Sequence, residues 1–309
     1  MLISASMRCD IPAFFAPWFL ERIREGYVLV RSPYDPAWVS RYQLDPRVVD
    51  AISFCTKNPA PLLDHLSLLA SFRQYWFVTI TPYGRDIEPF VPEKREVINS
   101  VKRLALAVGR KAVVWRYDPI LITPTYSVSY HLRAFMRMCA LLQGSCEAVV
   151  VSFLDLYPKT TRNFPEAQEV PEAWQQQLIQ AMVPIARRYH MVLRLCHEHQ
   201  GLGRFGADVR GCMTKDILEE ALGLSLNPPK RTGVRKGCAC LLGGDIGSYG
   251  CCPHLCAYCY ANEAKARVVE RFSLHDPSSP LLIGRLQPSD QVHQVVQHSW
   301  IDGQMRLGL

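Results

Sequence analysis

The sequence predicts an α/β protein: a complete or partial (β/α) barrel of the TIM type, followed by a cysteine-rich, cluster-binding extension. Three observations lead to this fold class. Apolar runs rich in β-formers recur every 20 to 45 residues or so, with helix-like segments between them. Many of these runs are continuously apolar, and a polar or charged residue follows nearly every one. This repetition is typical of parallel strands that alternate with helices.

The apolar runs predict seven strands and indicate an eighth. The run Ala148–Phe153 is apolar almost throughout, which suits a parallel strand covered on both faces. An eighth strand is expected near Leu241–Ile246, where the pattern is weaker. The seven predicted strands are Leu2–Ser6, Tyr27–Arg31, Ala51–Thr56, Trp76–Thr81, Ala112–Arg116, Ala148–Phe153 and Met191–Cys196.

Helix-like segments lie between these strands. Proline stands in the first turn of several of them, where its missing N–H leaves no hydrogen bond unmade. A further short helix is expected at Ala261–Arg271, after the cysteine-rich stretch. The predicted helices between strands are Pro12–Glu25, Pro61–Phe72, Pro92–Val108, Ser127–Leu142 and Pro171–Tyr189.

Size and composition are those of a globular protein with a sizeable core. The chain has 309 residues, of which 49% are hydrophobic and 20% charged. A barrel can use most of this length as one domain. We therefore expect a barrel over residues 1–229, a cysteine-rich iron–sulfur segment at its mouth over 230–265, and an extension over 266–309 packed on the barrel.

Charge and hydropathy restrict the partners. The formal charge of +7 permits an anionic partner but is too diffuse to require nucleic acid. The basic run Lys230–Lys236 predicts a solvated linker or a grip for a carboxylate or phosphate. No apolar run is long enough to cross a membrane and the start lacks a signal-peptide pattern, so a cytoplasmic location is expected. In that compartment, twelve cysteines indicate metal binding rather than disulfides.

Active sites of barrel enzymes lie where the strands end, so the residues there are candidates for the chemistry. Lys57, Arg116, Asp118 and Asp155 are predicted to position a small-molecule substrate and to exchange protons. Each could instead form a structural ion pair at the barrel rim. Residues predicted to bind a cofactor are Ser6, Arg8, Thr79, Asp245 and Tyr258.

The cysteine-rich stretch carries the main chemical signal. Cys252, Cys256 and Cys259 form a C-x3-C-x2-C motif, with Tyr258 just before the last cysteine. Three thiolates can ligate three irons of a [4Fe–4S] cluster and leave the fourth iron for another ligand. Soft thiolates select iron–sulfur centres or zinc over hard cations.

Cys238 and Cys240 are also predicted metal ligands: a fourth ligand, part of a second cluster, or a redox pair. Cys196 and Cys212 are candidate auxiliary thiols at the barrel mouth. Two alternatives stay open. A structural zinc ion could use Cys238 and Cys240 with Cys256 and Cys259, although C-x-C is tighter than usual zinc spacing, or the thiols could simply pack as small hydrophobes.

The order of several motifs resembles a bacterial family known as a domain of unknown function. The motifs are ISAS-x-R-x-DIPAF, CTKNPAP, TITPYG-x-DIEP, VVWRYDPI, SFLDLYPKT, and a terminal DIG-x-Y-x-x-C-x-H-x-C-x-YCYA signature. They cover nearly the whole chain. The resemblance implies membership of the family but no activity.

The cysteine motif also resembles that of radical S-adenosylmethionine enzymes such as spore photoproduct lyase. Cys252, Cys256, Tyr258 and Cys259 match its C-x3-C-x-aromatic-C pattern. The resemblance implies that the three cysteines hold a [4Fe–4S] cluster, that S-adenosylmethionine binds its unique iron, and that reduction yields a radical that abstracts a substrate hydrogen. Those enzymes carry the motif after the first strand. Here it follows the seventh, so the arrangement differs.

Taken together, the sequence predicts an iron–sulfur enzyme, and the resemblance implies radical S-adenosylmethionine chemistry in a noncanonical arrangement, with a flavodoxin or ferredoxin as electron donor. Zinc is the alternative metal. One rival is a barrel hydrolase or lyase with a structural zinc ion or cluster. The other is a redox-sensing or nucleic-acid-binding iron–sulfur protein that uses Lys230–Lys236.

Overall fold

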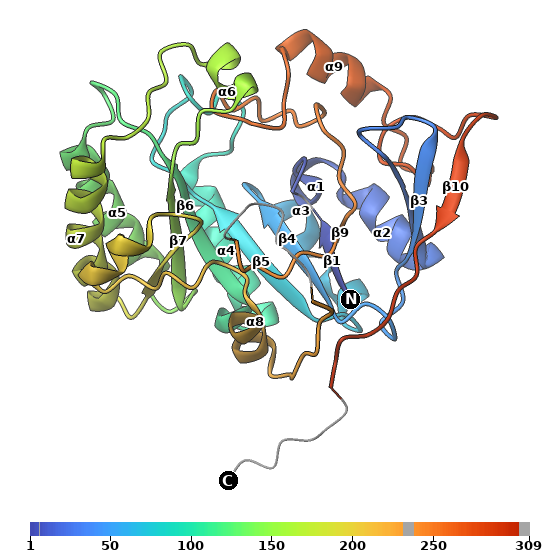
Figure 1. The fold of residues 1–309 in the computed structure, drawn as a ribbon, viewed down its shortest axis with the longest axis horizontal. Coiled ribbons are helices and arrows are strands. Elements are labelled where there is room, and N and C mark those ends of the chain that lie inside the picture. Colours follow the sequence, from blue (N-terminus) through green and yellow to red (C-terminus); the bar gives the residue numbers. More distant parts are fainter. Residues whose placement is uncertain (6, 231–237, 303–309) are drawn as a thin grey trace.

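The computed structural model describes residues 1–5, 7–230 and 238–302, and its centre is a parallel sheet (Figure 1). Seven strands of the described chain form this sheet, in the order β8-β7-β6-β5-β4-β1-β9. Their bounds are β1 Leu2–Ala5, β4 Ala51–Thr56, β5 Gln74–Thr79, β6 Val113–Ile120, β7 Ala148–Phe153, β8 Val192–Leu195 and β9 Gly244–Asp245.

The sheet has the strand sequence of a barrel but does not close within the described residues. From β1 through β4 to β8, each strand lies beside the next, and every neighbouring pair is parallel. Strand β9 pairs with the free side of β1. Strands β8 and β9 therefore remain edges, so the α/β class is confirmed and the complete barrel is not. With two residues, β9 offers little ladder for a further strand.

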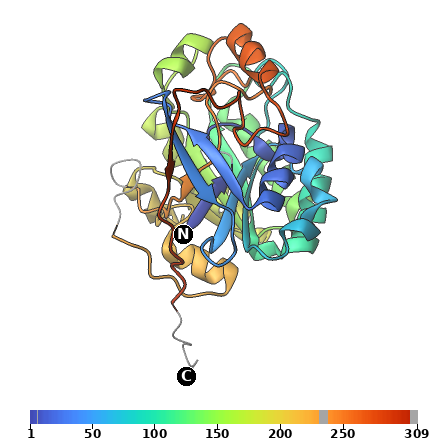
Figure 2. The same cartoon turned by 90° about the vertical axis from the view of Figure 1, so that its right-hand side faces the viewer.

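The predicted strand Tyr27–Arg31 exists but does not belong to the parallel sheet, so that assignment was wrong. As β2 (Tyr27–Arg31) it pairs antiparallel with β3 (Trp38–Gln43), because a short loop over residues 32–37 rather than a crossover helix follows it. The C-terminal strand β10 (Gln291–Gln294) joins the other side of β3 (Figure 2). Leu29, Val39 and Leu281 form a small apolar cluster beneath this sheet.

Helices cover the parallel sheet and link its strands. Helix α1 packs on β4, α4 on β6 and α7 on β8, while α5 fills the space between α4 and α7. Two predicted helices are interrupted: the first at Phe15, and the second after Leu63. The helices are α1 Ile11–Phe14, α2 Ala16–Glu25, α3 Ala60–Leu63, α4 Lys94–Val108, α5 Val128–Leu142, α6 Pro158–Asn163, α7 Glu172–Arg188, α8 Lys215–Leu222 and α9 Lys265–Ser273, with 3₁₀ turns η1 Leu66–Leu69, η2 Arg110–Ala112 and η3 Gln200–Phe205.

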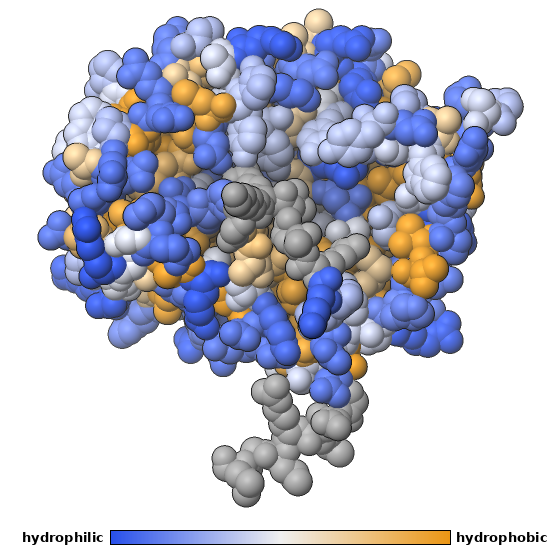
Figure 3. Space-filling view, viewed as in Figure 1, coloured by the Kyte–Doolittle hydropathy of each residue, from blue (hydrophilic) through white to orange (hydrophobic). Residues whose placement is uncertain are grey.

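Most strands of the parallel sheet are buried on both faces, as their continuous apolar runs predict, whereas the edge strand β8 exposes Val192. Residues of β1 and β7 are almost all inaccessible, and Trp76 of β5 stacks on Phe54 of β4 with ring centroids 3.9 Å apart. Polar side chains cover most of the molecular face in Figure 3, with apolar residues in separate small patches. None of the described helices is both long and apolar enough to span a membrane.

Candidate functional site

A cavity of ≈ 350 Å³ lies at the carboxyl ends of the parallel strands. Because parallel strands all end at the same edge of a sheet, residues far apart in sequence meet there. The segment from Cys238 to Asn262 crosses this edge and supplies one wall of the cavity. Sequence-predicted residues that line it are Arg8, Lys57, Thr79, Arg116, Asp118, Asp155, Cys196, Cys212, Cys238, Cys240, Cys252, Cys256, Tyr258 and Cys259.

Of the residues predicted to bind a cofactor, Asp245 is placed differently. Asp245 is not among the lining residues: it lies 4.0 Å from the Arg8 guanidinium and accepts a hydrogen bond from the Gly247 amide. It can hold Arg8 in place but does not face the cavity. Ser6, and the basic run apart from Lys230, lie outside the described residues.

The first cysteine group consists of Cys252, Cys256 and Cys259. All three side chains line the cavity, and burial raises the pKa of each thiol, that of Cys256 to about 12. The Lys57 ammonium lies close enough to Cys256 and Cys259 to oppose this effect and favour thiolates. The amide of Asn262 donates a hydrogen bond to Cys259 Sγ over 3.4 Å.

The second cysteine group consists of Cys196, Cys212, Cys238 and Cys240. Cys212 Sγ lies 3.6 Å from Cys196 Sγ and 3.5 Å from Cys240 Sγ. Cys238 also contacts Cys240, and contact with Cys212 lowers the pKa of Cys240 to about 5. The structure thus joins the C-x-C pair to the two thiols predicted to be auxiliary. The remaining motif neighbour, Cys251, turns away and donates to the Ser248 carbonyl over 3.1 Å.

As the side chains stand, no group of three or more His, Cys, Asp or Glu residues in the described ranges could hold a metal ion. Loading either cysteine group therefore requires its side chains to turn toward a common centre. Cysteine has one side-chain torsion, and rotation between its staggered wells moves the sulfur without moving the backbone.

Asp10 anchors the cysteine loop to the sheet. Its Oδ2 accepts hydrogen bonds from His254 Nε2 over 2.9 Å and from the Lys57 amide over 2.8 Å, while its Oδ1 accepts from Thr56 Oγ1 over 2.6 Å. His254 lies inside the cysteine motif and is almost fully buried. The loop between Cys252 and Cys256 is thereby fixed to the ends of β1 and β4.

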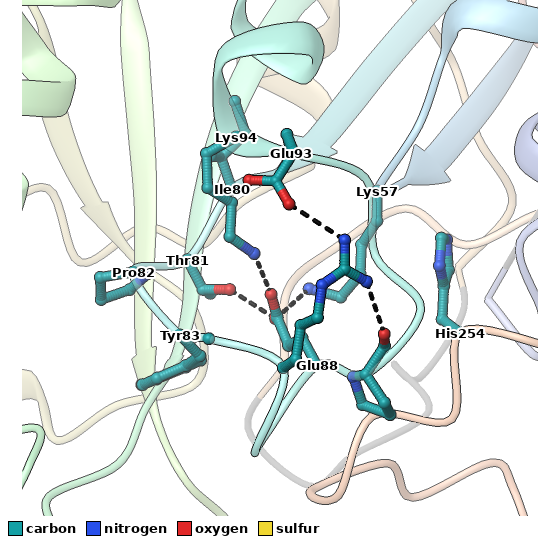
Figure 4. A network of polar contacts seen from close by, with 12 residues as sticks. Lys57, Ile80, Thr81, Pro82, Tyr83, Glu88, Glu93, Lys94 and His254 are labelled. Carbon is teal, nitrogen blue, oxygen red and sulfur yellow. Dashed lines mark hydrogen bonds and ion pairs between the residues drawn. The ribbon is translucent and has the colours of Figure 1, made fainter.

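Glu88 forms a second anchor (Figure 4). Glu88 is buried, and its carboxylate accepts hydrogen bonds from Lys57 over 2.7 Å and from Thr81, Tyr258 and Lys94. Burial alone raises the pKa of Glu88, but Lys57 and Lys94 outweigh it and hold the pKa at about 2. Glu88 therefore stays charged and ties Tyr258 to Lys57.

Arg116 and Asp118 project into the cavity from β6 as an ion pair. Arg116 Nε donates to Asp118 Oδ2 over 2.8 Å, and Ser152 donates to the other carboxylate oxygen. The guanidinium carbon lies 5.2 Å from the centre of the Phe77 ring. Burial raises the pKa of Asp118, yet Arg116 and Ser152 keep it below its usual value. By contrast, Asp155 is exposed at the rim, where it accepts a hydrogen bond from Tyr157.

Sequence reasoning overlooked Glu88 and His254 as site residues. Glu88 follows no predicted strand directly, since it lies in the loop after β5, so its role depends on tertiary contacts. His254 had a readable signal, because it stands between two cysteines of the motif.

Comparison with known protein families identifies the family of the chain. A family model described as "Domain of unknown function (DUF1848)" matches residues 2–261, which covers the parallel sheet and the cysteine loop. No curated protein matches the chain.

Proposed function

The chain belongs to this DUF1848 family, and we propose that it is an iron–sulfur enzyme that acts on a small molecule in the cavity at the strand ends. One observation carries the proposal: three thiols at C-x3-C-x2-C spacing share a single cavity with an arginine, a lysine and carboxylates from several strands. Pockets that combine convergent polar groups with perturbed pKa values are the usual places for catalysis.

The residues of the first cysteine group suit a [4Fe–4S] cluster in their chemistry. Cys252, Cys256 and Cys259 are soft donors on one short loop. Because three thiolates ligate three irons, the fourth iron of the cluster is left for another ligand. The Lys57 ammonium and the Asn262 amide supply the positive charge and N–H donation that stabilise cluster sulfurs. With S-adenosylmethionine bound, such a cluster supplies one-electron reduction and radical chemistry.

The chain's own groups bind and orient the substrate. Arg116, held by Asp118 and stacked near Phe77, presents its remaining N–H groups to a carboxylate or phosphate. Lys57 is fixed between Glu88 and the cysteine loop, so it acts on the cluster side of the cavity. Asp155, at the rim, is placed to exchange protons with solvent. The electron donor would be a flavodoxin or ferredoxin.

A second candidate is a hydrolase or lyase whose active site is the same cavity and whose metal only stabilises the fold. The compact second cysteine group suits a structural metal, which this candidate requires as the metal of the protein. Zinc without iron or sulfide in protein purified under nitrogen would support this candidate.

Anaerobic purification with iron and sulfide analysis tests the proposal. We expect brown protein that dithionite bleaches, and release of 5′-deoxyadenosine when S-adenosylmethionine and dithionite are added. Cys252→Ala, Cys256→Ala and Cys259→Ala should each lose iron, whereas Cys139→Ala and Cys146→Ala, at buried sites away from the cavity lining, should retain it. Equal iron in all five variants would overturn the ligand assignment.

Arg116→Ala separates substrate binding from cluster binding. The variant should keep its iron content, while the rate of substrate turnover should fall by about 100-fold or more. This is the range for loss of a positioned charged group. Unchanged turnover would remove Arg116 from the site.

A further inference from the structure

Four cysteines outside the C-x3-C-x2-C motif meet at one side of the cavity. Cys196 follows β8, Cys212 lies in the loop before α8, and Cys238 and Cys240 lie in the segment before β9. The sulfur of Cys212 contacts two others at 3.5 and 3.6 Å. Three separate segments therefore bring thiols to one place.

The separations between these free thiols argue against two kinds of centre and suit a third. A disulfide has an S–S bond of about 2.05 Å and joins two cysteines, so it cannot account for a sulfur with two neighbours. A cubane cluster binds each thiolate to a different iron, which keeps the ligand sulfurs well apart. A single tetrahedral ion with bonds of about 2.3 Å places its sulfurs about 3.8 Å from one another. The two known separations, 3.5 and 3.6 Å, are near this value, so rotation of the side chains can bring the sulfurs to a geometry that no described group has as it stands.

The surroundings suit a negatively charged metal centre. Four thiolates on a divalent ion carry a net double negative charge, and the Arg116 guanidinium lies near Cys196 and Cys212. The amide of Met213 donates to Cys240 Sγ over 3.3 Å, the kind of outer hydrogen bond that orients a ligand.

We propose that Cys196, Cys212, Cys238 and Cys240 form a second metal site, which takes one tetrahedral zinc ion and is separate from the site of Cys252, Cys256 and Cys259. On loading, the side chains turn toward a common centre and the thiols that are still protonated release their protons to solvent. The site connects the loop after β8 with the segment before β9. Strands β8 and β9 are the two edge strands of the open sheet. Zinc then links the edges that no strand pairing joins in the described residues.

Metal analysis of the full chain, purified anaerobically, tests the site. We expect one zinc per chain, and zinc X-ray absorption with four sulfur ligands at about 2.3 Å. Absence of zinc, a first shell containing nitrogen or oxygen, or a disulfide among these four cysteines in the metal-free native protein would each overturn the proposal.

Variants separate this site from the cluster. Cys212→Ser and Cys240→Ser should lose zinc by more than tenfold and keep iron, while Cys256→Ser should lose iron and keep zinc. Cys146→Ser, buried elsewhere, is the matched control and should keep both metals. Iron and sulfide that fall with Cys212→Ser would overturn zinc in favour of a second cluster. If Cys212→Ser does not fold, zinc content and X-ray absorption of the unmodified chain decide.

Discussion

Glu88 shows how a single buried carboxylate organises the wall of the cavity. Lys57, Thr81, Lys94 and Tyr258 all donate to it, and its side chain is inaccessible to solvent. Each donor comes from a different part of the chain, so the contact links the ends of β4 and β5 to the cysteine loop. Loss of its charge would leave the positive charges of Lys57 and Lys94 without this carboxylate as a partner.

We predict that Glu88→Gln lowers the free energy of unfolding by about 3–5 kcal/mol, because removal of one partner leaves buried cations unpaired. Urea unfolding under reducing conditions measures this. The matched control is Glu93→Gln, whose pair with Arg85 is largely exposed, 3.0 Å apart, and should change stability by less than about 1 kcal/mol. Equal effects of the two substitutions would contradict the assigned role of Glu88.

His131 is a buried histidine that the fold holds neutral. Its Nε2–H donates to the Leu121 carbonyl over 2.9 Å and its Nδ1 accepts from the Tyr117 hydroxyl over 2.8 Å. Burial lowers the pKa of His131 to about 4, while the Leu121 contact opposes the shift in part. Between pH 6.5 and this value, His131 is protonated in the unfolded chain but stays neutral in the folded chain.

Stability should therefore fall as the pH drops through this window, by about 2 kcal/mol from pH 7 to pH 5 on account of His131. Urea unfolding at the two pH values measures the change. His131→Gln, which cannot titrate there, should lose this part of the pH dependence even if it is less stable overall. The same pH dependence in both proteins would exclude His131 as its source.

At the scale of elements, strand β9 is the piece that places the cysteine segment. It adds to β1 with Ile3 opposite Gly244 and Ser4 opposite Asp245. A methyl group on Gly243 would lie 1.8 Å from the Leu2 carbonyl oxygen, so only glycine allows this approach. The pairing fixes the stretch between Cys240 and Cys252 against the first strand.

Gly243→Ala should destabilise the fold by about 1–3 kcal/mol or more, because the backbone of β1 or β9 must shift. It should also reduce bound metal, since Cys240 and Cys252 flank this strand. Gly201→Ala is the control: its added carbon meets only the side chain of exposed His199, and its effect should stay below about 1 kcal/mol. Thermal unfolding and metal content measure both effects. If Gly243→Ala changes neither the unfolding temperature nor the metal content, β9 does not position the cysteine segment.

At the scale of the whole molecule, the sheet is open and the cysteine segment spans its mouth. Strands β8 and β9 are the edges within the described chain, and the two sulfur groups lie between the strand ends and the covering segment. A ligand that binds only this folded arrangement stabilises it by mass action.

Anaerobic loading of iron and sulfide should therefore raise the unfolding temperature, by about 4 °C if free ligand is about 100 times its Kd. Differential scanning calorimetry of apo and loaded protein measures the shift. Cys256→Ala should show no shift under the same treatment. An equal shift in the variant would mean that iron acts elsewhere on the chain.

Much of the fold and part of the site could be predicted from residue patterns alone. Continuous apolar runs identified six strands of the parallel sheet, and polar residues at or near the predicted strand ends identified Lys57, Arg116 and Asp118 as cavity residues. These are local properties, since burial on both faces requires apolar residues at every position and strand ends meet at one edge. The C-x3-C-x2-C spacing likewise marked three cysteines that share the cavity.

Other features depended on contacts between distant segments. Whether Tyr27–Arg31 joined the main sheet depended on its partner β3, and whether the sheet closed depended on whether its edge strands β8 and β9 paired. Contacts between distant segments also bring Cys238 and Cys240 to Cys196 and Cys212. The roles of Glu88 and His254 depend on such contacts as well. Residue periodicity reports which face of an element is buried. Which other element covers that face is decided only when the chain folds.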